Sequence, residues 1–140
     1  MSDTTIVHLL RHGEVDNPGG IIYGRLPGYH LSANGQAMAE AAADYFSERA
    51  VVALFCSPLE RAQETAREAA AGREAVCVTH QLPIWVTRRT AEGRRLWHNP
   101  AMRECALGSV TSFTYSGDRL AGVSYTVPAR RQVTQDDAAQ

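Results

Sequence analysis

Four side chains that could bind phosphate follow apolar segments of this 140-residue sequence: Arg11, His12, Arg61 and His80. Each comes directly after an apolar run or within five residues of its end. Guanidinium groups bind phosphate oxygens in a bidentate manner, and imidazole groups offer further hydrogen bonds. The residue types therefore indicate a phosphate site, provided that the fold brings the ends of the three segments together.

Three apolar runs predict the strands that must position these side chains. The runs cover residues 6–10, 51–56 and 75–79. Near-continuous apolar runs are typical of strands buried on both faces of a parallel sheet. Further along, residues 109–115 and 119–126 flank a Gly117-Asp118 turn, which predicts an antiparallel hairpin at the edge of the sheet.

Helix signals separate the predicted strands. Ser32 is the expected N-cap of a helix with one buried apolar stripe, formed by Met38, Ala41, Ala42, Tyr45 and Phe46. Ser57 and Glu60 have the spacing of a capping box, and the helix that follows is expected to cover residues 58–71. Pro83 is expected to open a further helix after the third strand.

The alternation of strands and helices predicts an α/β fold, a three-layer α/β/α sandwich with a mostly parallel sheet and a C-terminal antiparallel hairpin. We expect residues 1–127 to form a single domain and the polar residues 128–140 to form a flexible tail. Ligands of open α/β sheets bind at the carboxyl ends of the strands. If the three parallel strands are neighbours, the four side chains meet there, next to the Gly- and Pro-rich loop 14–30.

Composition narrows the class of partner. The formal net charge of -1 gives no general attraction to anions, so we expect neither a nucleic-acid nor a membrane partner. The N-terminal apolar stretch is too short and too polar in its flanks for a signal peptide, which favours a cytoplasmic protein. Three cysteines without CxxC spacing predict buried reduced thiols. Trp85 and Trp97 are expected to anchor the core or a subunit interface, which leaves a homodimer open.

Three sequence blocks each lie at the end of a predicted strand. Residues 10–14 read LRHGE, residues 57–66 read SPLERAQETA, and residues 78–80 read VTH. In this order they resemble the RHGE signature, the SPLxRAxxTA block and the V-[ST]-H strand end of the histidine phosphatase (phosphoglycerate mutase-like) superfamily. Gly24 and Gly35 also fall where that superfamily has its G…LTxxG segment. On this resemblance the chain is identified as an internally shortened member.

The resemblance implies a role for each of the four side chains. His12 would accept the phosphoryl group of a small phosphomonoester, giving a phosphohistidine that water hydrolyses, without a metal or other cofactor. Arg11, Arg61 and His80 would hold the phosphoryl oxygens during the transfer. Weaker contacts to the substrate are expected from Gly13, Asn17, Gly24 and Gln81.

The sequence departs from the superfamily pattern between the second and third blocks. Members normally carry several dozen residues there, including the segment that supplies a glutamate as general acid, whereas here only residues 67–75 and two residues of the third predicted strand, 76–77, separate the two blocks. The other superfamily position for the acid is an Asp directly after the second histidine, but this sequence has Gln81. Three carboxylates are conceivable substitutes: Glu14, Glu92 and Glu104.

The expected function is a metal-independent phosphomonoester hydrolase that works through His12. The alternative from a different class is a non-catalytic or weakly active remnant that binds phosphate or a partner, which the missing acid favours. A phosphoglycerate mutase-type phosphotransferase is less favoured, because it requires a closed pocket that retains a bisphosphate. Cysteine-dependent phosphatases need the spacing C-x5-R, and Arg61 follows Cys56 one position too early.

Overall fold

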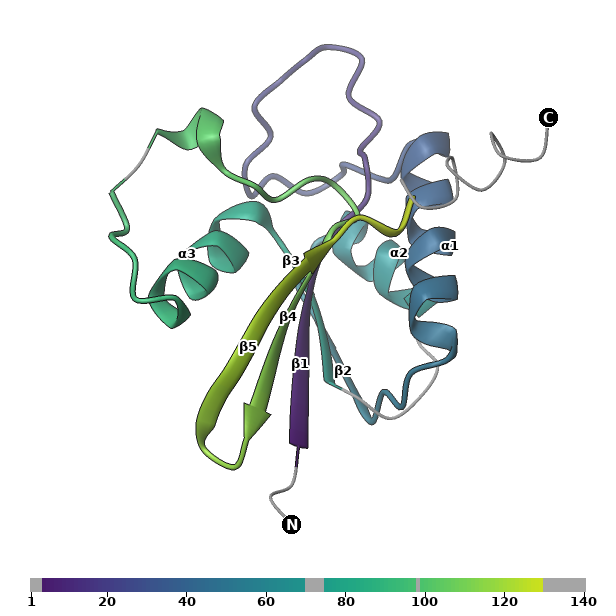
Figure 1. Cartoon of the computed structure of the whole chain (residues 1–140). Helices are drawn as coiled ribbons and strands as arrows, with labels where there is room; N and C mark the ends of the chain where they lie inside the picture. Colours follow the sequence, from purple (N-terminus) through teal and green to yellow (C-terminus); the bar gives the residue numbers. More distant parts are fainter. Residues whose placement is uncertain (1–3, 70–74, 98, 130–140) are drawn as a thin grey trace, which may run out of the picture.

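The structure, a computed structural model, describes residues 4–69, 75–97 and 99–129. Within these ranges lie five strands, three α-helices and one short 3-10 turn (Figure 1). In chain order they are β1 (Thr4–Arg11), α1 (Ala33–Ser47), β2 (Ala53–Cys56), α2 (Glu60–Ala69), β3 (Ala75–Thr79), α3 (Gln81–Ala91), the 3-10 turn (Pro100–Met102), β4 (Val110–Ser116) and β5 (Arg119–Thr126).

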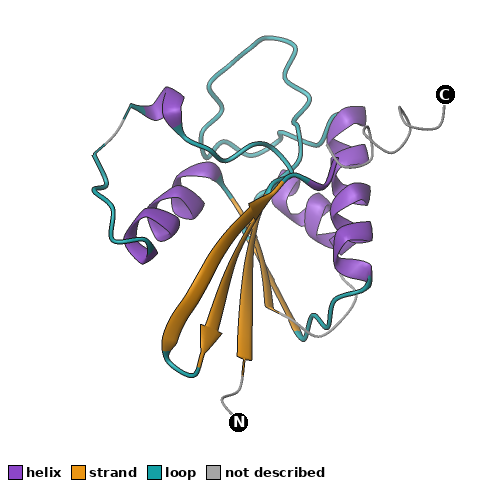
Figure 2. Ribbon diagram, viewed as in Figure 1, coloured by secondary structure: helices purple, strands orange, loops and turns teal. Residues whose placement is uncertain are grey.

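The strands form one sheet in the order β2-β3-β1-β4-β5. β2, β3 and β1 are parallel neighbours, whereas β4 and β5 form an antiparallel hairpin that pairs with β1. Helices α1 and α2 lie on one side of the sheet and α3 lies on the other (Figure 2). The predicted α/β sandwich, with parallel strands and a C-terminal antiparallel hairpin, is therefore confirmed.

The main core lies between the sheet and the pair of helices α1 and α2. Its buried residues are Leu10, Ala42, Phe46, Val51, Ala62, Ala66, Val76, Val78 and Val110. Ser32 caps α1 as predicted, since its side-chain oxygen accepts a hydrogen bond from the backbone N–H of Gly35 at 3.0 Å. On the opposite face, Trp85 of α3 is buried, whereas Trp97 is 93% exposed. The central strands β1 and β3 are thus held from both sides.

Strand β2 lies at the edge of the sheet, which corrects the prediction of a strand buried on both faces. In the described part of the chain its only neighbour is β3, and the side chain of Phe55 is 62% exposed. Cys56 is exposed and Cys77 is only half-buried, so the expectation of three buried thiols holds for Cys105 alone. An apolar run does not specify whether the strand becomes central or an edge, because that depends on strand order.

The capping box expected at the start of the second helix does not form. Helix α2 begins at Glu60, whose carboxylate accepts a hydrogen bond from the backbone N–H of Gly28 at 3.0 Å rather than from Ser57. The third helix begins at Gln81, with His80 as its N-cap, and so starts before Pro83. The expected end of the second helix near residue 71, and most of the expected tail, lie outside the described residues.

A contact between two backbones joins the end of β1 to the start of α1. A Cβ atom at Gly35 would lie 2.0 Å from the carbonyl oxygen of Glu14, and one at Gly13 would lie 2.6 Å from the carbonyl oxygen of Gly35. Both separations are far below van der Waals contact, so only glycine fits at these two positions. The segment that carries His12 is therefore packed directly on the first turn of α1.

Candidate active site

The four predicted side chains meet at the carboxyl ends of the parallel strands. Arg11 is the last residue of β1 and His12 follows it, while His80 follows β3 and Arg61 lies in the first turn of α2. The ring centroids of His12 and His80 are 5.2 Å apart. Loop 14–30 rises from the same end of the sheet, between β1 and α1 (Figure 1). Strand order thus brings together residues up to 69 positions apart in the sequence.

His12 is placed to act as a neutral nitrogen nucleophile. The imidazole is 3% exposed, and its Nδ1 lies 2.8 Å from the carbonyl oxygen of Gly13. Because a carbonyl only accepts hydrogen bonds, Nδ1 carries the proton and Nε2 carries the lone pair. Burial, reinforced by the charges of Arg11, His80 and Arg61, lowers the pKa of His12 to about 4. The ring is therefore neutral at pH 7, with Nε2 available for attack.

The low pKa of His12 predicts a pH-dependent stability. Between pH 6.5 and pH 4 the unfolded chain binds a proton at this residue and the folded chain does not, so acidification favours unfolding. The contribution of His12 is complete above pH 6.5, and about 3 kcal/mol is lost by pH 4. Urea unfolding of the wild type and His12→Gln across this range measures it, because glutamine does not titrate. Identical pH profiles of the two proteins would refute the assignment.

Arg61 is fully buried beneath loop 14–30. Its Nη2 donates to the carbonyl oxygen of Gly24 at 2.8 Å and its Nη1 to that of Leu26 at 3.3 Å. The ring of Tyr23 covers the guanidinium, with 4.9 Å between the Arg61 Cζ and the ring centroid. The Arg61 Nε–H is buried and has no acceptor among the described residues. Two of five donors are thus committed to the loop, which leaves others for a ligand.

Arg11, at the end of β1, is tied to the segment before β4. Its Nη1 donates to the carbonyl oxygen of Cys105 at 2.5 Å. Its Nε–H, like that of Arg61, is buried without an acceptor among the described residues. Burial lowers the pKa of Arg11, so the charged guanidinium is held in poorly solvated surroundings. Buried donors without partners are rare in folded proteins, and oxygens of a bound phosphoryl group would satisfy both of these.

Two residues to which the sequence analysis gave no role in the site support it. The hydroxyl of Ser57 lies 2.8 Å from Nε2 of His80. The hydroxyl of Thr65 accepts from the backbone N–H of Gly13 at 3.1 Å and donates to the carbonyl oxygen of Arg61 at 2.7 Å. Both residues belong to the block SPLERAQETA, so the signal was present in the sequence but was used for Arg61 alone. Through these bonds, residues 57–66 connect the segment that carries His12 with the segment that carries His80.

The weaker predicted contacts have other partners in the structure. Both ends of the Asn17 amide bond the backbone of Ile21, at 2.9 and 3.1 Å, so Asn17 closes its own loop instead of reaching toward His12. The carbonyl of Gly24 accepts a hydrogen bond from Arg61. The side-chain oxygen of Gln81 accepts from Arg103 at 3.4 Å. The structure therefore brings the four main side chains together, but gives these three residues supporting contacts.

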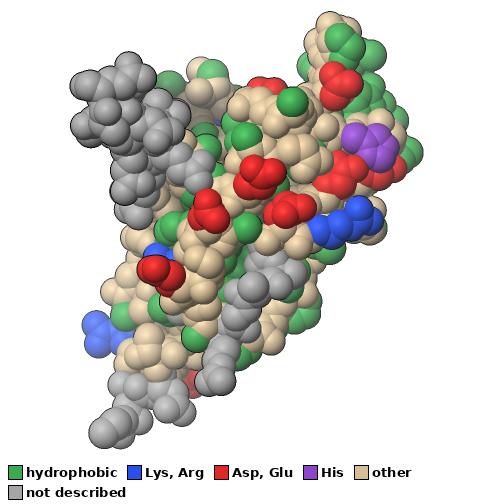
Figure 3. Space-filling view, turned by 90° about the vertical axis from the view of Figure 1, so that its right-hand side faces the viewer, with side chains coloured by type: hydrophobic (Ala, Val, Ile, Leu, Met, Phe, Trp, Pro, Cys, Tyr) green, Lys and Arg blue, Asp and Glu red, His purple; other side chains and the backbone are tan. Residues whose placement is uncertain are grey.

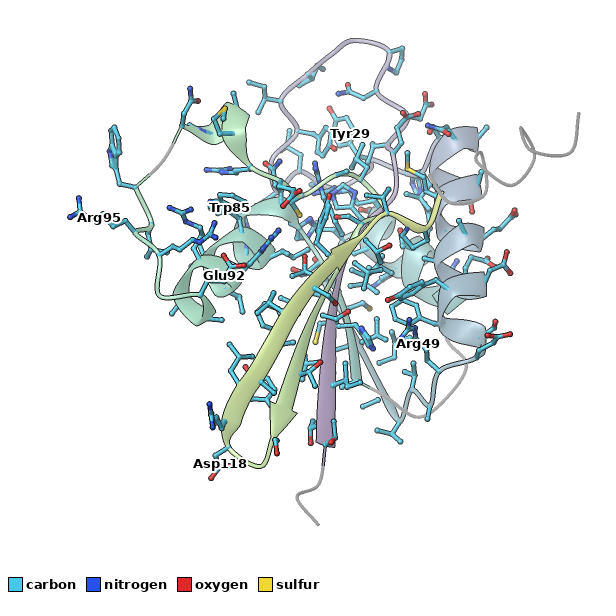
Figure 4. The ribbon with its side chains drawn as sticks, viewed as in Figure 1. Tyr29, Arg49, Trp85, Glu92, Arg95 and Asp118 are labelled. Atoms are coloured by element: carbon cyan, nitrogen blue, oxygen red, sulfur yellow. The ribbon has the colours of Figure 1, made fainter. Side chains whose placement is uncertain are left out.

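The three conceivable general acids are already engaged. The carboxylate of Glu14 accepts from the hydroxyl of Ser32 at 2.7 Å and from the Asn34 amide at 3.1 Å, and these bonds lower its pKa. The carboxylates of Glu92 and Glu104 both pair with Arg88, at 3.1 and 2.9 Å. Figure 4 labels Glu92 on α3, well away from the loop that carries Tyr29. None of the three is poised to donate a proton to a ligand at His12.

Away from the site, the surface over α1 is acidic (Figure 3). On the face formed by α1, several acidic side chains gather, as Figure 3 shows, and Glu40, Asp44 and Glu48 are exposed there. No helix in residues 4–69, 75–97 and 99–129 is long and apolar enough to cross a membrane. Over the same ranges, no three His, Cys, Asp or Glu side chains converge as a metal ion would require.

Comparison with protein families and with curated proteins agrees with this geometry. The model of the histidine phosphatase superfamily (branch 1) matches residues 7–76. An uncharacterized protein of Mycobacterium tuberculosis is 38% identical over an alignment that covers 92% of this chain and 99% of that protein. The alignment is 200 positions long, whereas this chain has 140 residues, so the relative contains residues that have no counterpart here.

Solved structures share the fold at low sequence identity. A putative alpha-ribazole-5'-P phosphatase of Escherichia coli superimposes with a TM-score of 0.71 at 15% identity, covering 89% of this chain and 96% of that one. A mycobacterial glucosyl-3-phosphoglycerate phosphatase gives 0.69 at 17% identity, with coverages of 89% and 98%. The Entamoeba histolytica phosphoserine phosphatase gives 0.68 at 17% identity, with 89% and 99%. The fold is thus that of a group of phosphatases.

Proposed function

Because this chain belongs to the histidine phosphatase superfamily, we propose that it hydrolyses phosphomonoesters through a phosphohistidine formed on His12. The observation that carries the proposal is the state of His12, which is buried and neutral, with Nδ1 bonded to Gly13 and Nε2 left for attack. The charges of Arg11 and Arg61 act on it, and their buried Nε–H groups have no acceptor within the described part of the chain. The substrate is a small phosphorylated molecule, and the chain's own side chains supply all the cationic groups.

The first chemical step transfers the phosphoryl group to His12. The lone pair of Nε2 forms a bond to phosphorus while the bond to the ester oxygen breaks and its electron pair leaves with that oxygen. Arg11 and Arg61 donate to the equatorial oxygens, where negative charge spreads in the transition state. His80, held by the hydroxyl of Ser57, adds a further polar contact to the same group. The bond from Nδ1 to Gly13 stabilises the positive charge that the ring acquires.

The second step returns the enzyme to its starting state. Water attacks the phosphorus of the phosphohistidine, the bond from phosphorus to Nε2 breaks, and inorganic phosphate leaves with the oxygen and both protons of that water, as dihydrogen phosphate. The nitrogen regains its lone pair, and Nδ1 keeps its proton throughout. The same donors hold the phosphoryl oxygens in both steps, so the site needs no rearrangement between them.

Hydrolysis of p-nitrophenyl phosphate tests the proposal. We expect the wild type to turn over this ester and His12→Ala to lose at least about 10²-fold in kcat, because the covalent route is closed. Rapid acid-free quenching should also trap a phosphorylated wild-type protein that is stable to base and labile to acid, as a phosphoramidate is. The comparison variant is His30→Ala, which removes an exposed imidazole bonded to Glu64 and should still give the trapped phosphorylated protein.

The results distinguish a phosphatase that uses His12 from a non-catalytic remnant. Hydrolysis that continues unchanged in His12→Ala would rule out His12 as the nucleophile. A non-catalytic remnant is the second candidate, because the three conceivable acids are engaged elsewhere. It predicts that the wild type binds inorganic phosphate but turns over neither aryl nor alkyl phosphates, and that no phosphorylated protein is trapped.

A further inference from the structure

Loop 14–30 holds one arginine at a fixed place beside the phosphate site. The carbonyl groups on either side of Arg25, those of Gly24 and Leu26, both accept hydrogen bonds from the buried guanidinium of Arg61. The ring of Tyr23 lies over the same guanidinium and is stacked on Tyr29 at 4.9 Å. The backbone of Arg25 is therefore clamped by the very side chain that is proposed to bind phosphate.

A second set of bonds fixes the loop from outside. Glu60 accepts from the N–H of Gly28, and both carboxylate oxygens of Glu64 are used, one by the ring of His30 and one by the N–H of Leu31 at 2.8 Å. These bonds tie the loop to α2. They use one carboxylate oxygen of Glu60 and both oxygens of Glu64.

The side chain of Arg25 is exposed, in contrast to its fixed backbone. The structure gives its guanidinium no hydrogen bond, ion pair or ring contact with the described residues. Other arginines near the site each donate a hydrogen bond within the protein: Arg11 to the carbonyl of Cys105, and Arg103 to the side chain of Gln81. Arg25 is close enough to His80 that its charge lowers the pKa of that histidine, after the larger effects of burial, Arg61 and Arg11.

We propose that Arg25 determines specificity by binding a second anionic group of the substrate, such as a carboxylate or a further phosphate on the leaving group. Like charges repel, so a third guanidinium beside Arg11 and Arg61 is unfavourable in the empty site. A ligand with two negative groups offsets that repulsion, one group at His12 and the other at Arg25. The planar guanidinium suits either oxyanion. The substrate class is then a phosphomonoester that carries a second acid.

This inference rests on the proposed function, because it takes the phosphoryl group to lie at His12, but its test needs no turnover. The ligands are 3-phosphonopropionate and its neutral amide, which share the phosphonate and differ only in the second acid. Calorimetry at low ionic strength gives the ratio of their dissociation constants. We expect the wild type to bind the acid about fivefold more tightly than the amide and Arg25→Gln to bind the two equally.

Two variants serve as controls for Arg25→Gln. Arg119→Gln removes an exposed arginine of the β4–β5 hairpin, which Figure 4 marks with Asp118 at the opposite end of the sheet, and should keep the fivefold ratio. Arg103→Gln should keep it as well. A preference that persists in Arg25→Gln, or that is lost in Arg103→Gln alone, would overturn the inference, as would equal binding by the wild type. Turnover independent of His12 with the preference intact would instead refute the proposed function.

Discussion

p-Nitrophenyl phosphate should be hydrolysed at least about 10²-fold faster than an alkyl phosphate such as ethyl phosphate. General acid catalysis typically contributes about 10²–10⁴ to the departure of a poor leaving group. The nitrophenolate leaves readily without a proton, whereas an alkoxide does not. The rate for the alkyl ester therefore measures whether any group of this chain donates a proton to the leaving oxygen.

The structure explains why Glu14 and His80 are poor proton donors. Glu14 is bonded by Ser32 and Asn34, which favours its ionised form and opposes proton donation. Burial and the neighbouring arginines lower the pKa of His80. Like His12, it is therefore a neutral imidazole at pH 7. The groups that remain around His12 stabilise negative charge, but they do not give up a proton easily.

A series of aryl and alkyl phosphates provides the measurement. We expect log kcat/KM to fall steeply as the leaving group becomes more basic, in both the wild type and Glu14→Gln. Glu104→Gln is the matched control, since the carboxylate of Glu104 is paired with Arg88 of α3. A flat dependence in the wild type would show that the chain holds a general acid, and a dependence that steepens only in one of these variants would identify it.

Replacement of Arg61 by glutamine should lower kcat/KM for p-nitrophenyl phosphate by about 10²–10³-fold. Removal of one preorganised donor to a developing negative charge commonly costs this much. Arg61 is also the anchor of loop 14–30 through the carbonyls of Gly24 and Leu26, so the variant loses phosphate contacts and loop order together. Arg61→Lys keeps the charge but cannot bond both carbonyls and phosphate at once, and should recover only part of the rate.

Arg49 provides a control that matches the local contacts of Arg61. Its guanidinium lies over the ring of Tyr45 at 4.1 Å and donates to the carbonyl of the same residue at 3.2 Å, but it stands at the end of α1, away from the site (Figure 4). Arg49→Gln should leave kcat/KM unchanged. Wild-type activity in a folded Arg61→Gln protein, with folding checked by urea unfolding, would exclude Arg61 from the phosphate site.

Much of the fold follows from local sequence pattern. The apolar run before Arg11, the helix capped by Ser32 and the hairpin around Gly117-Asp118 all occur as predicted, because each signal comes from neighbouring residues. The meeting of Arg11, His12, Arg61 and His80 follows as well, since parallel strands present their carboxyl ends on one edge. The local pattern, together with this topological rule, was sufficient to locate the candidate site.

The failures concern contacts between distant parts of the chain. Glu60 has the right spacing for a capping box, but it binds Gly28, 32 residues away. The apolar run 51–56 resembles a buried strand, and only the strand order makes it an edge. Thr65 supports Gly13 across 52 residues. In each case, a tertiary partner competes with the local one, and a single sequence does not reveal which partner is favoured.

The backbone contact between Gly13 and Gly35 restricts substitution at the two glycines in a way that does not apply to His12. Side chains at these two positions are excluded by the packing alone, whether or not the protein is an enzyme. The contact between the two glycines does not involve the imidazole of His12, so this contact by itself does not require a histidine at position 12. A descendant that lost catalysis would be expected to retain both glycines and to vary at position 12. Among relatives of this chain, a retained glycine pair with a replaced histidine would therefore mark a domain that keeps the fold without the proposed chemistry.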